Sequence, residues 1–416
     1  MKRRVWLAVA GLLLAGCQAG ERAARWDTYQ EPVAPQELPR AAGLSELKML
    51  WRRDLGDGPE DGYALLQPAY SDGGGGDGGV VRDGAGGALY AASRSSVFKL
   101  APADGAIQWR RDLESELGAA VFSGVGIAMA GAVAVDEGGV VAVALDDGRV
   151  IALDAASGET LWAAPLGRQI SAIPAVGISR VVARTADGLV AGLDAATGES
   201  VWSFERDMPA LSIHGDSPPL ISGDAVFTGL ASGKLVANSV VTGREYWETE
   251  VSFASGRNEL ERLTDTDSAP LVSAATLFIA TYQGHVAALR LQDAALQWKA
   301  EVSSRLPMAL GGGRLLVTAD LGAVVALDAG SGEVLWTQEG FRGHGMSGPL
   351  VVGAGARVVV GDAAGNLYAL DAADGRLLEK RNLGGGAVVA LAAGPGQFAV
   401  FSAGGRLSVW ALDAAE

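Results

Sequence analysis

The sequence predicts an all-β fold: an eight-bladed β-propeller of four-stranded antiparallel blades, with the ring closed by strands from both chain ends. One observation is a motif that recurs about every 40 to 50 residues, the period of a propeller or solenoid. Another is the alternation of apolar and polar residues between glycine-rich turns within each copy, which is typical of strands. The last is an incomplete copy at each end of the chain.

A typical copy of the motif runs from an aspartate through a turn to a tryptophan. The clear copies are ALDAASGETLW ending at Trp162, GLDAATGESVW at Trp202, ALDAGSGEVLW at Trp336 and ALDAADGRLLE at Glu379, and weaker copies end at Trp109, Trp247 and Trp298. In six of these seven copies a glycine lies four residues before the last position, whereas Ala294 stands there in the copy ending at Trp298. We interpret the aspartate as a turn acceptor, the glycine as the residue that takes positive φ, and the tryptophan as a packing residue of the outermost strand.

The two incomplete copies complement each other. The C-terminal copy, QFAVFSAGGRLSVWAL from Gln397, lacks an outermost strand, and LKMLWRRDL from Leu47 is such a strand alone, carrying Trp51. Together they predict the eighth blade, which hides the sheet edges of the ring. The propeller is expected to span residues 45–416.

The N-terminal region predicts export. Residues 1–16 form a signal peptide, because a basic start precedes a short apolar run. The run ends in LAGC, which resembles the bacterial lipobox and implies lipidation of Cys17; an ordinary secretory signal followed by a chance cysteine is the alternative. Residues 17–44 are polar and proline-bearing, as expected of a lipidated N-terminus and flexible tether. Gln18 favours the outer membrane, with the protein facing the periplasm.

Composition narrows the class of partner. The chain has 48 acidic and 33 basic residues, a formal net charge of −15, which argues against nucleic acid. Cys17 is the single cysteine, so no intramolecular disulfide can form.

The repeat resembles that of quinoprotein-type propellers, which include pyrroloquinoline-quinone alcohol dehydrogenases and non-enzymatic relatives. The resemblance implies that an enzyme of this type would have an axial cofactor pocket, a calcium site and a catalytic aspartate. Its larger members also have a vicinal cysteine pair. The recurring aspartates (Asp154, Asp194, Asp328 and Asp371) occupy equivalent turns, and the histidines (His214, His285 and His344) have no metal-binding spacing. We therefore expect no catalytic residue, no metal site and no cofactor.

Two other segments have structural interpretations. The glycine-rich run from Ser71 to Gly87 has no Walker lysine and predicts a surface loop of the first blade. Similar segments begin the innermost strands: SPPL at Ser217, SAPL at Ser268, SGPL at Ser347 and AIPAV at Ala172. These prolines fit strand-entry geometry, with an axial small-molecule site as the alternative.

Two connectors are longer than ring closure requires, which is where functional loops are expected. One, residues 205–216, joins the third and fourth blades, and the other, residues 252–267, joins the fourth and fifth. Both lead from an outermost strand to the next innermost strand, so they should be neighbours on one face. Apolar Leu211 and Ile213 beside acidic Asp265 and Asp267 predict a protein-binding surface; the alternative is that the apolar residues cover the blade junction.

The segments DMPALSIHGDSPP from Asp207 and ASGRNELERLTDTDSAPLV from Ala254 resemble loops of the propeller lipoprotein family of the outer-membrane β-barrel assembly machinery. The resemblance extends from the lipobox to the C-terminus. It implies docking on the periplasmic POTRA domains of BamA, the barrel-inserting subunit, through Leu211, Ile213, His214, Asp265 and Asp267. A member of that family has arginine where this chain has His214, and a neutral imidazole cannot replace a guanidinium fork.

We accordingly expect a non-enzymatic outer-membrane scaffold that assists assembly of β-barrel proteins; direct contact with unfolded barrel precursors is left open. The enzymatic alternative is a quinone-dependent dehydrogenase or a small-molecule-binding relative, which calcium-dependent quinone uptake would reveal. A scaffold for another envelope complex is the third alternative.

Overall fold

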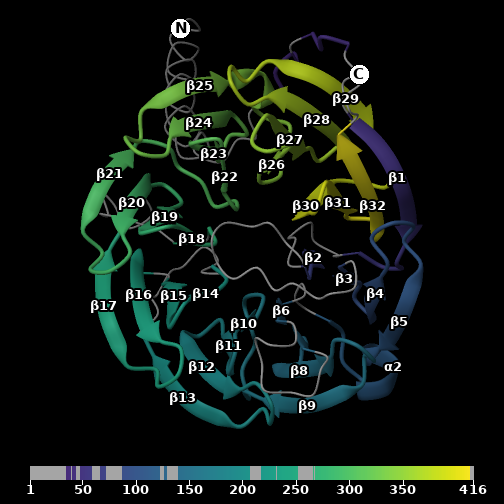
Figure 1. Ribbon diagram of the computed structural model, residues 1–416, viewed down its shortest axis with the longest axis vertical. Helices are drawn as coiled ribbons and strands as arrows, with labels where there is room; N and C mark the ends of the chain where they lie inside the picture. Colours follow the sequence, from purple (N-terminus) through teal and green to yellow (C-terminus); the bar gives the residue numbers. More distant parts are fainter. Residues whose placement is uncertain are drawn as a thin grey trace, which may run out of the picture.

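The computed structural model describes residues 34–38, 40–43, 47–58, 66–71, 87–121, 126–128, 139–206, 217–230, 232–251, 266 and 268–412. Their strands form eight four-stranded antiparallel sheets, arranged as blades around a central axis (Figure 1). Seven blades are each continuous in sequence, and the eighth combines the first strand with the last three. The predicted fold class is confirmed.

The strands are given from the innermost to the outermost of each blade. The first blade is β2 (Ala69–Tyr70), β3 (Leu89–Ala92), β4 (Ser96–Leu100) and β5 (Ile107–Asp112), and the second is β6 (Gly126–Ala128), β7 (Val140–Ala144), β8 (Arg149–Asp154) and β9 (Thr160–Pro165). The third is β10 (Ala175–Val176), β11 (Arg180–Arg184), β12 (Leu189–Asp194) and β13 (Ser200–Glu205), and the fourth is β14 (Leu220–Ser222), β15 (Ala225–Gly229), β16 (Lys234–Ser239) and β17 (Glu245–Glu250).

The second half of the ring repeats this order. The fifth blade is β18 (Leu271–Ser273), β19 (Thr276–Ala280), β20 (Val286–Arg290) and β21 (Leu296–Ala300), and the sixth is β22 (Ala309–Gly311), β23 (Arg314–Thr318), β24 (Val324–Asp328) and β25 (Val334–Gln338). The seventh is β26 (Leu350–Val352), β27 (Arg357–Gly361), β28 (Asn366–Asp371) and β29 (Leu377–Asn382), and the eighth is β30 (Val388–Gly394), β31 (Gln397–Ser402), β32 (Arg406–Leu412) and β1 (Leu47–Asp54). Helix α2 (Leu113–Leu117) and the 3₁₀ helix η2 (Glu339–Phe341) lie in connectors between blades.

The chain ends close the ring as the sequence predicts. Strand β1 pairs antiparallel with β32, from Leu47 opposite Leu412 to Asp54 opposite Arg406. The seventh blade joins this closure through Glu379, whose carboxylate accepts the backbone N–H of Leu47 at 2.8 Å.

Tryptophans join successive blades. Trp162 of the second blade donates its indole N–H to the carbonyl of Ala195 in the third blade at 2.9 Å, and its ring covers Gly198. A Cβ at Gly198, whose φ is +75°, would lie 2.6 Å from the indole, so the turn requires glycine. Equivalent bonds of 2.7–3.2 Å are made by Trp51, Trp109, Trp202, Trp247, Trp298 and Trp336. The predicted structural role of these tryptophans is confirmed.

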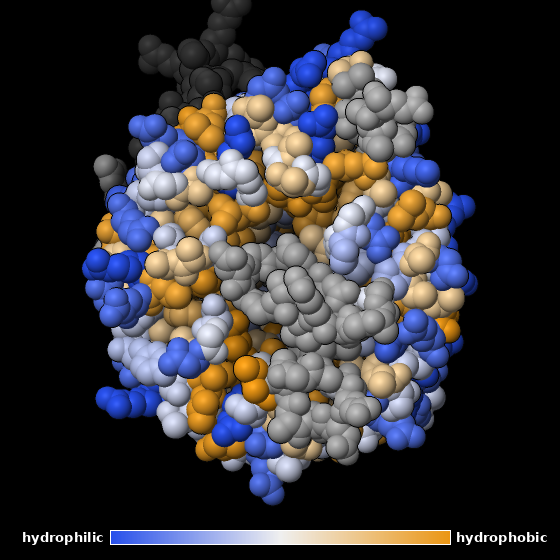
Figure 2. Space-filling model, in the orientation of Figure 1, coloured by the Kyte–Doolittle hydropathy of each residue, from blue (hydrophilic) through white to orange (hydrophobic). Residues whose placement is uncertain are grey.

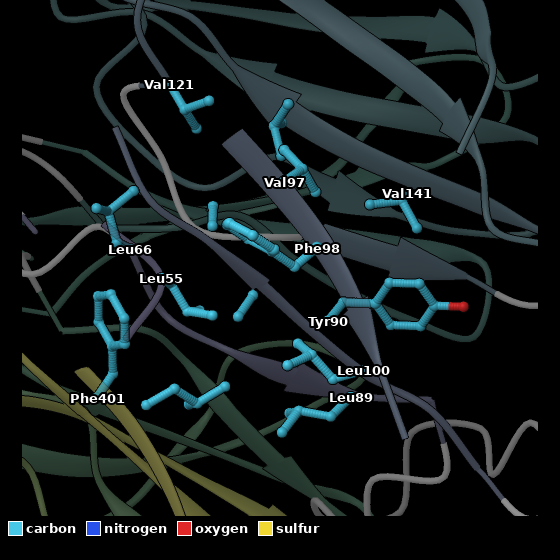
Figure 3. Close-up of a cluster of buried hydrophobic side chains, with 14 of the residues drawn as sticks. Leu55, Leu66, Leu89, Tyr90, Val97, Phe98, Leu100, Val121, Val141 and Phe401 are labelled. Atoms are coloured by element: carbon cyan, nitrogen blue, oxygen red, sulfur yellow. The ribbon is translucent and has the colours of Figure 1, made fainter. Parts of the chain in front are cut away.

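Apolar cores lie between neighbouring blades. The core at the first blade combines Tyr90 and Phe98 with Val141 of the second blade and Phe401 of the eighth (Figure 3). The two middle strands of a blade supply most buried side chains, as in β7, where all five residues are buried. Viewed down the axis, hydrophilic residues are frequent along the rim, and apolar residues lie nearer the centre (Figure 2).

The N-terminal segment preceding β1 contacts the propeller. Gln36 N donates to the Arg342 carbonyl at 3.1 Å, and Ala42 N donates to the Leu377 carbonyl at 3.1 Å. Leu38 and Ala41 pack on the core shared by the sixth and seventh blades. This part of the region assigned to the tether from sequence therefore lies on the blade surface. In the portion of the chain described, no helix has the length and apolar character needed to cross a membrane.

Candidate functional site

The predicted site residues fall outside the described part of the chain. Leu211, Ile213 and His214 belong to the first long connector, and Asp265 and Asp267 belong to the second. The lipidation candidate Cys17 also lies outside the described residues. The structure does describe both ends of each connector, and these ends position the surface.

Both connectors begin in the same way. Arg206 N, after β13, donates to the Gly188 carbonyl at 3.2 Å, and Val251 N, after β17, donates to the Gly233 carbonyl at 3.0 Å. Each acceptor belongs to the turn between the second and third strands of the same blade. The two connectors therefore leave adjacent blades at equivalent positions on one face, as the sequence predicts.

The far ends of the connectors are joined directly. Ser217 Oγ donates to the Ser268 carbonyl at 3.0 Å, and both residues are fully buried. Thr266 Oγ1 donates to the Leu230 carbonyl at 2.7 Å, which brings the second connector back to the fourth blade. Gly229 fits between these ends: a Cβ there would lie 2.6 Å from Thr266 Oγ1 and 3.0 Å from Ser217 Oγ.

A buried cation supports the end of the first connector. Arg184, the last residue of β11, is 1% exposed and donates from Nη1 to the Ser217 carbonyl at 3.3 Å. The equivalent residues of other blades are small: Ala144, Gly229, Ala280, Thr318 and Gly361. Sequence reasoning missed Arg184, although an arginine at the strand end where other copies have a small residue was a usable signal.

The beginning of the first connector is fixed by ion pairs. Arg206 contacts Glu245 at 2.6 Å and Glu248 at 3.3 Å on β17 of the next blade, and its guanidinium lies over the Phe204 ring. Lys234 also pairs with Glu248 at 2.8 Å. The hydrogen bond from Lys234, assisted by the charges of Lys234 and Arg206, lowers the pKa of Glu248. The outermost strand of the fourth blade thus holds the base of the connector that precedes it.

The other candidates have structural contacts. Asp154 Oδ1 accepts the N–H of Ser157 at 2.6 Å, and Asp328 Oδ1 accepts the N–H of Ser331 at 2.8 Å, as predicted for turn residues. Ser347 Oγ accepts the N–H of Gly361 at 2.9 Å, which favours the geometric interpretation of the blade starts.

The histidines that the structure describes lie in different parts of the ring. His344 Nε2 donates to the Gln36 carbonyl at 2.9 Å, and His285 follows the turn between β19 and β20. No group of three or more potential metal ligands occurs among the residues that are described.

Comparisons with known proteins show the family to which this propeller belongs. The family model described as "Outer membrane protein assembly factor BamB" matches residues 93–338 and 320–416. A relative of that description from Pseudomonas aeruginosa is 34% identical over 414 residues, covering 99% of each chain. The crystal structure of BamB from Moraxella catarrhalis matches with a TM-score of 0.73 at 26% identity, covering 88% of this chain and 99% of that chain.

A quinohemoprotein alcohol dehydrogenase from Comamonas testosteroni is similar with a TM-score of 0.65 at 16% identity, covering 90% of this chain and 78% of that chain. This likeness shows the shared fold alone. By class, the chain is an eight-bladed propeller with quinoprotein-like repeats. Within that class it belongs to the family of the outer membrane protein assembly factor BamB. It is thus a member of a family of assembly factors and not of the dehydrogenases, in agreement with the expectation of a non-enzymatic protein.

Proposed function

We propose that this chain is a non-enzymatic assembly factor that supports insertion of β-barrel proteins into the outer membrane as part of the BAM complex. The observation that carries the proposal is the match to an assembly factor of the same description along 99% of both chains. Because the match covers 99% of both chains, the whole molecule, and not one module of it, corresponds to that relative.

The proposed contact with the POTRA domains of BamA is made by the two long connectors. Support comes from their ends, which Ser217 and Ser268 join at 3.0 Å, so the connectors arise side by side. Burial of Leu211 and Ile213 would supply affinity, while Asp265 and Asp267 would select a basic edge of the partner. A rigid base reduces the entropy lost when the connectors bind.

We further propose that Cys17 carries the lipid anchor and that the propeller faces the periplasm. An anchored propeller would meet its membrane-embedded partner at a raised effective concentration, which strengthens binding without any further contact. Metabolic labelling with palmitate tests the anchor. Label should enter the wild-type chain and be lost in Cys17→Ser, and equal labelling of both would refute it.

The partner contact is tested by pull-down with the POTRA segment of BamA from the same organism. The variant Leu211→Ala/Asp265→Ala should lose binding while it unfolds at the same denaturant concentration as wild type. The matched control is Leu321→Ala/Asp147→Ala, which removes one apolar and one acidic side chain from turns of the sixth and second blades on the same face.

The control variant should bind like wild type. Equal binding by all three proteins would keep the partner but refute the connector site. Absence of binding by wild type would refute the proposed partner.

A further inference from the structure

An open groove separates the outermost strands of the seventh and eighth blades. It has a volume of about 550 Å³ and lies where β29 faces β1, with β32 also contributing. Four cationic side chains line it: Lys48 and Arg52 from β1, Arg381 from β29 and Arg406 from β32. No carboxylate is among its lining residues, although the formal net charge of the chain is −15.

The carboxylates nearby leave most of this positive charge uncompensated. Buried Glu379 forms an ion pair with Arg381. Asp54, two residues beyond Arg52 on β1, accepts the N–H of Gly56 at 3.0 Å. Arg406 Nη1 donates to the Gly384 carbonyl at 2.7 Å, which fixes the guanidinium without neutralising it. Within the described ranges, no ion pair involves Lys48, Arg52 or Arg406.

We propose that this groove binds the phosphate headgroups of anionic phospholipids in the membrane to which the protein is anchored. Guanidinium groups bind phosphate through paired hydrogen bonds, and cationic side chains are attracted to an anionic leaflet. The acidic remainder of the chain is repelled by the same leaflet. Attraction of the groove and repulsion of the remaining surface therefore orient the molecule with the junction of the seventh and eighth blades toward the membrane. The inference rests on the proposed lipid anchor.

Apolar side chains beside the cations favour a lipid over an acidic peptide. Met49 is 45% exposed and lines the groove, and its neighbour Leu50 is 40% exposed. Cations together with exposed apolar side chains match an interface of headgroups and acyl chains. The sixteen residues between Cys17 and Ala34 let these two residues lie at most about 60 Å apart. This length lets the groove reach the surface that holds the anchor.

Binding to vesicles tests the proposal independently of the anchor. The chain from residue 17 onward, carrying Cys17→Ala, keeps every residue that the structure describes. It should co-sediment with vesicles of equimolar phosphatidylcholine and phosphatidylglycerol about tenfold more strongly than with phosphatidylcholine alone, and salt should weaken this binding. Absence of palmitate label from the wild-type chain would refute the anchor, whereas absence of this preference for anionic vesicles would refute the groove.

Charge reversal locates the site. Lys48→Glu/Arg52→Glu should reduce binding about tenfold, to the level of neutral vesicles, and Lys48→Arg/Arg52→Lys should retain it. The matched control, Arg53→Glu/Lys299→Glu, makes the same change in net charge at exposed positions outside the groove and should bind like the parent chain.

Equal losses in the groove and control variants would overturn the proposal, because net charge and not the groove would then explain binding. Absence of a preference for phosphatidylglycerol would also overturn it. Groove-dependent binding of polyglutamate without vesicle binding would instead assign the groove to an acidic polypeptide.

Discussion

Ser217 and Ser268 occupy equivalent positions at the starts of the fourth and fifth blades, and the hydroxyl of the first donates to the carbonyl of the second at 3.0 Å. Ser268 continues the pattern by donating to the Leu306 carbonyl at 2.9 Å. Each connector thus ends on a hydrogen bond to the following blade. The separation of the two connectors is set by buried backbone groups and not by the connectors themselves.

Removing this hydrogen bond should destabilise the fold. Ser217→Ala leaves the buried Ser268 carbonyl without this donor, so we expect the free energy of unfolding to fall by about 1–2 kcal/mol. Urea unfolding measures the change. Ser203→Ala, at an exposed position of β13, is the control and should stay within about 0.5 kcal/mol of wild type. Equal stabilities of the two variants would contradict the assigned role.

Filling the space between the connector ends should weaken partner binding. A Cβ at Gly229 would meet Thr266 Oγ1 and Ser217 Oγ, so Gly229→Ala must push the ends apart. The cost is expected to be about 1–3 kcal/mol. Gly311→Ala overpacks the sixth blade against Val351 and serves as the control for stability. Only Gly229→Ala should reduce pull-down with BamA, the proposed partner, and equal reduction by both variants would exclude a specific effect on the connectors.

Replacing Ala294 by glycine should stabilise the turn in which this residue lies. Its φ is +56°, and its position in the repeat is that of Gly198, Gly243 and Gly332, which also have positive φ. Because the left-handed region costs a residue with Cβ about 1–2 kcal/mol, Ala294→Gly should raise the free energy of unfolding by about 1 kcal/mol. The converse variant, Gly332→Ala, should lower it, since its Cβ would collide with Trp298. Thermal unfolding of both checks the sign.

Two substitutions should distinguish the role of Glu379 as a hydrogen-bond acceptor from the effect of its negative charge. Its carboxylate accepts the N–H of Leu47 at 2.8 Å, at the one blade junction where the next turn is replaced by the start of β1. Glu379→Leu leaves this buried N–H unpaired and should lower the free energy of unfolding by about 1–3 kcal/mol. Glu379→Gln keeps an acceptor and should lose less. Hydrogen exchange at β1 should accelerate in the leucine variant first, and unchanged exchange would argue against the closure role.

Low pH should weaken the ion pairs that support the beginning of the first connector. Ion pairing with Lys234 and Arg206 holds the pKa of Glu248 below its usual 4.5. The stability contributed is therefore present above pH 4.5 and is lost as the pH falls through the lowered pKa. Glu248→Gln should cost about 0.5 kcal/mol at pH 7 and nothing at low pH, because the pair is partly exposed. Ser203→Ala, which removes no titratable group from an exposed position of β13, is the control and should change stability equally at both pH values.

The repeat made most of the architecture predictable, because aspartate, glycine and tryptophan recur at fixed spacing and each spacing has one structural meaning. Pairing of β1 with β32 followed from two complementary fragments. The adjacency of the connector ends followed from topology. The five connector residues from Leu211 to Asp267 and the acylation of Cys17 stay predictions.

Contacts between distant residues left no local pattern in the sequence. Gln36 meets Arg342 across about three hundred residues, and neither residue is unusual in its own segment. Register shifts beside the tryptophans, such as that between Gly192 and Leu193, depend on the twist of the completed blade. The sequence did not reveal the role of Glu379, because its only signal was a glutamate at the position where other copies of the motif have tryptophan.

The path of residues 34–43 over the sixth and seventh blades has a mechanical consequence. Tension applied to the chain before Ala34 first loads the hydrogen bonds at Gln36 and Ala42 and the apolar contacts of Leu38 and Ala41. Strand β1 is loaded only after these contacts give way. A pull on the N-terminus is therefore borne first by this segment, and the pairing of β1 with β32 is protected until these contacts break.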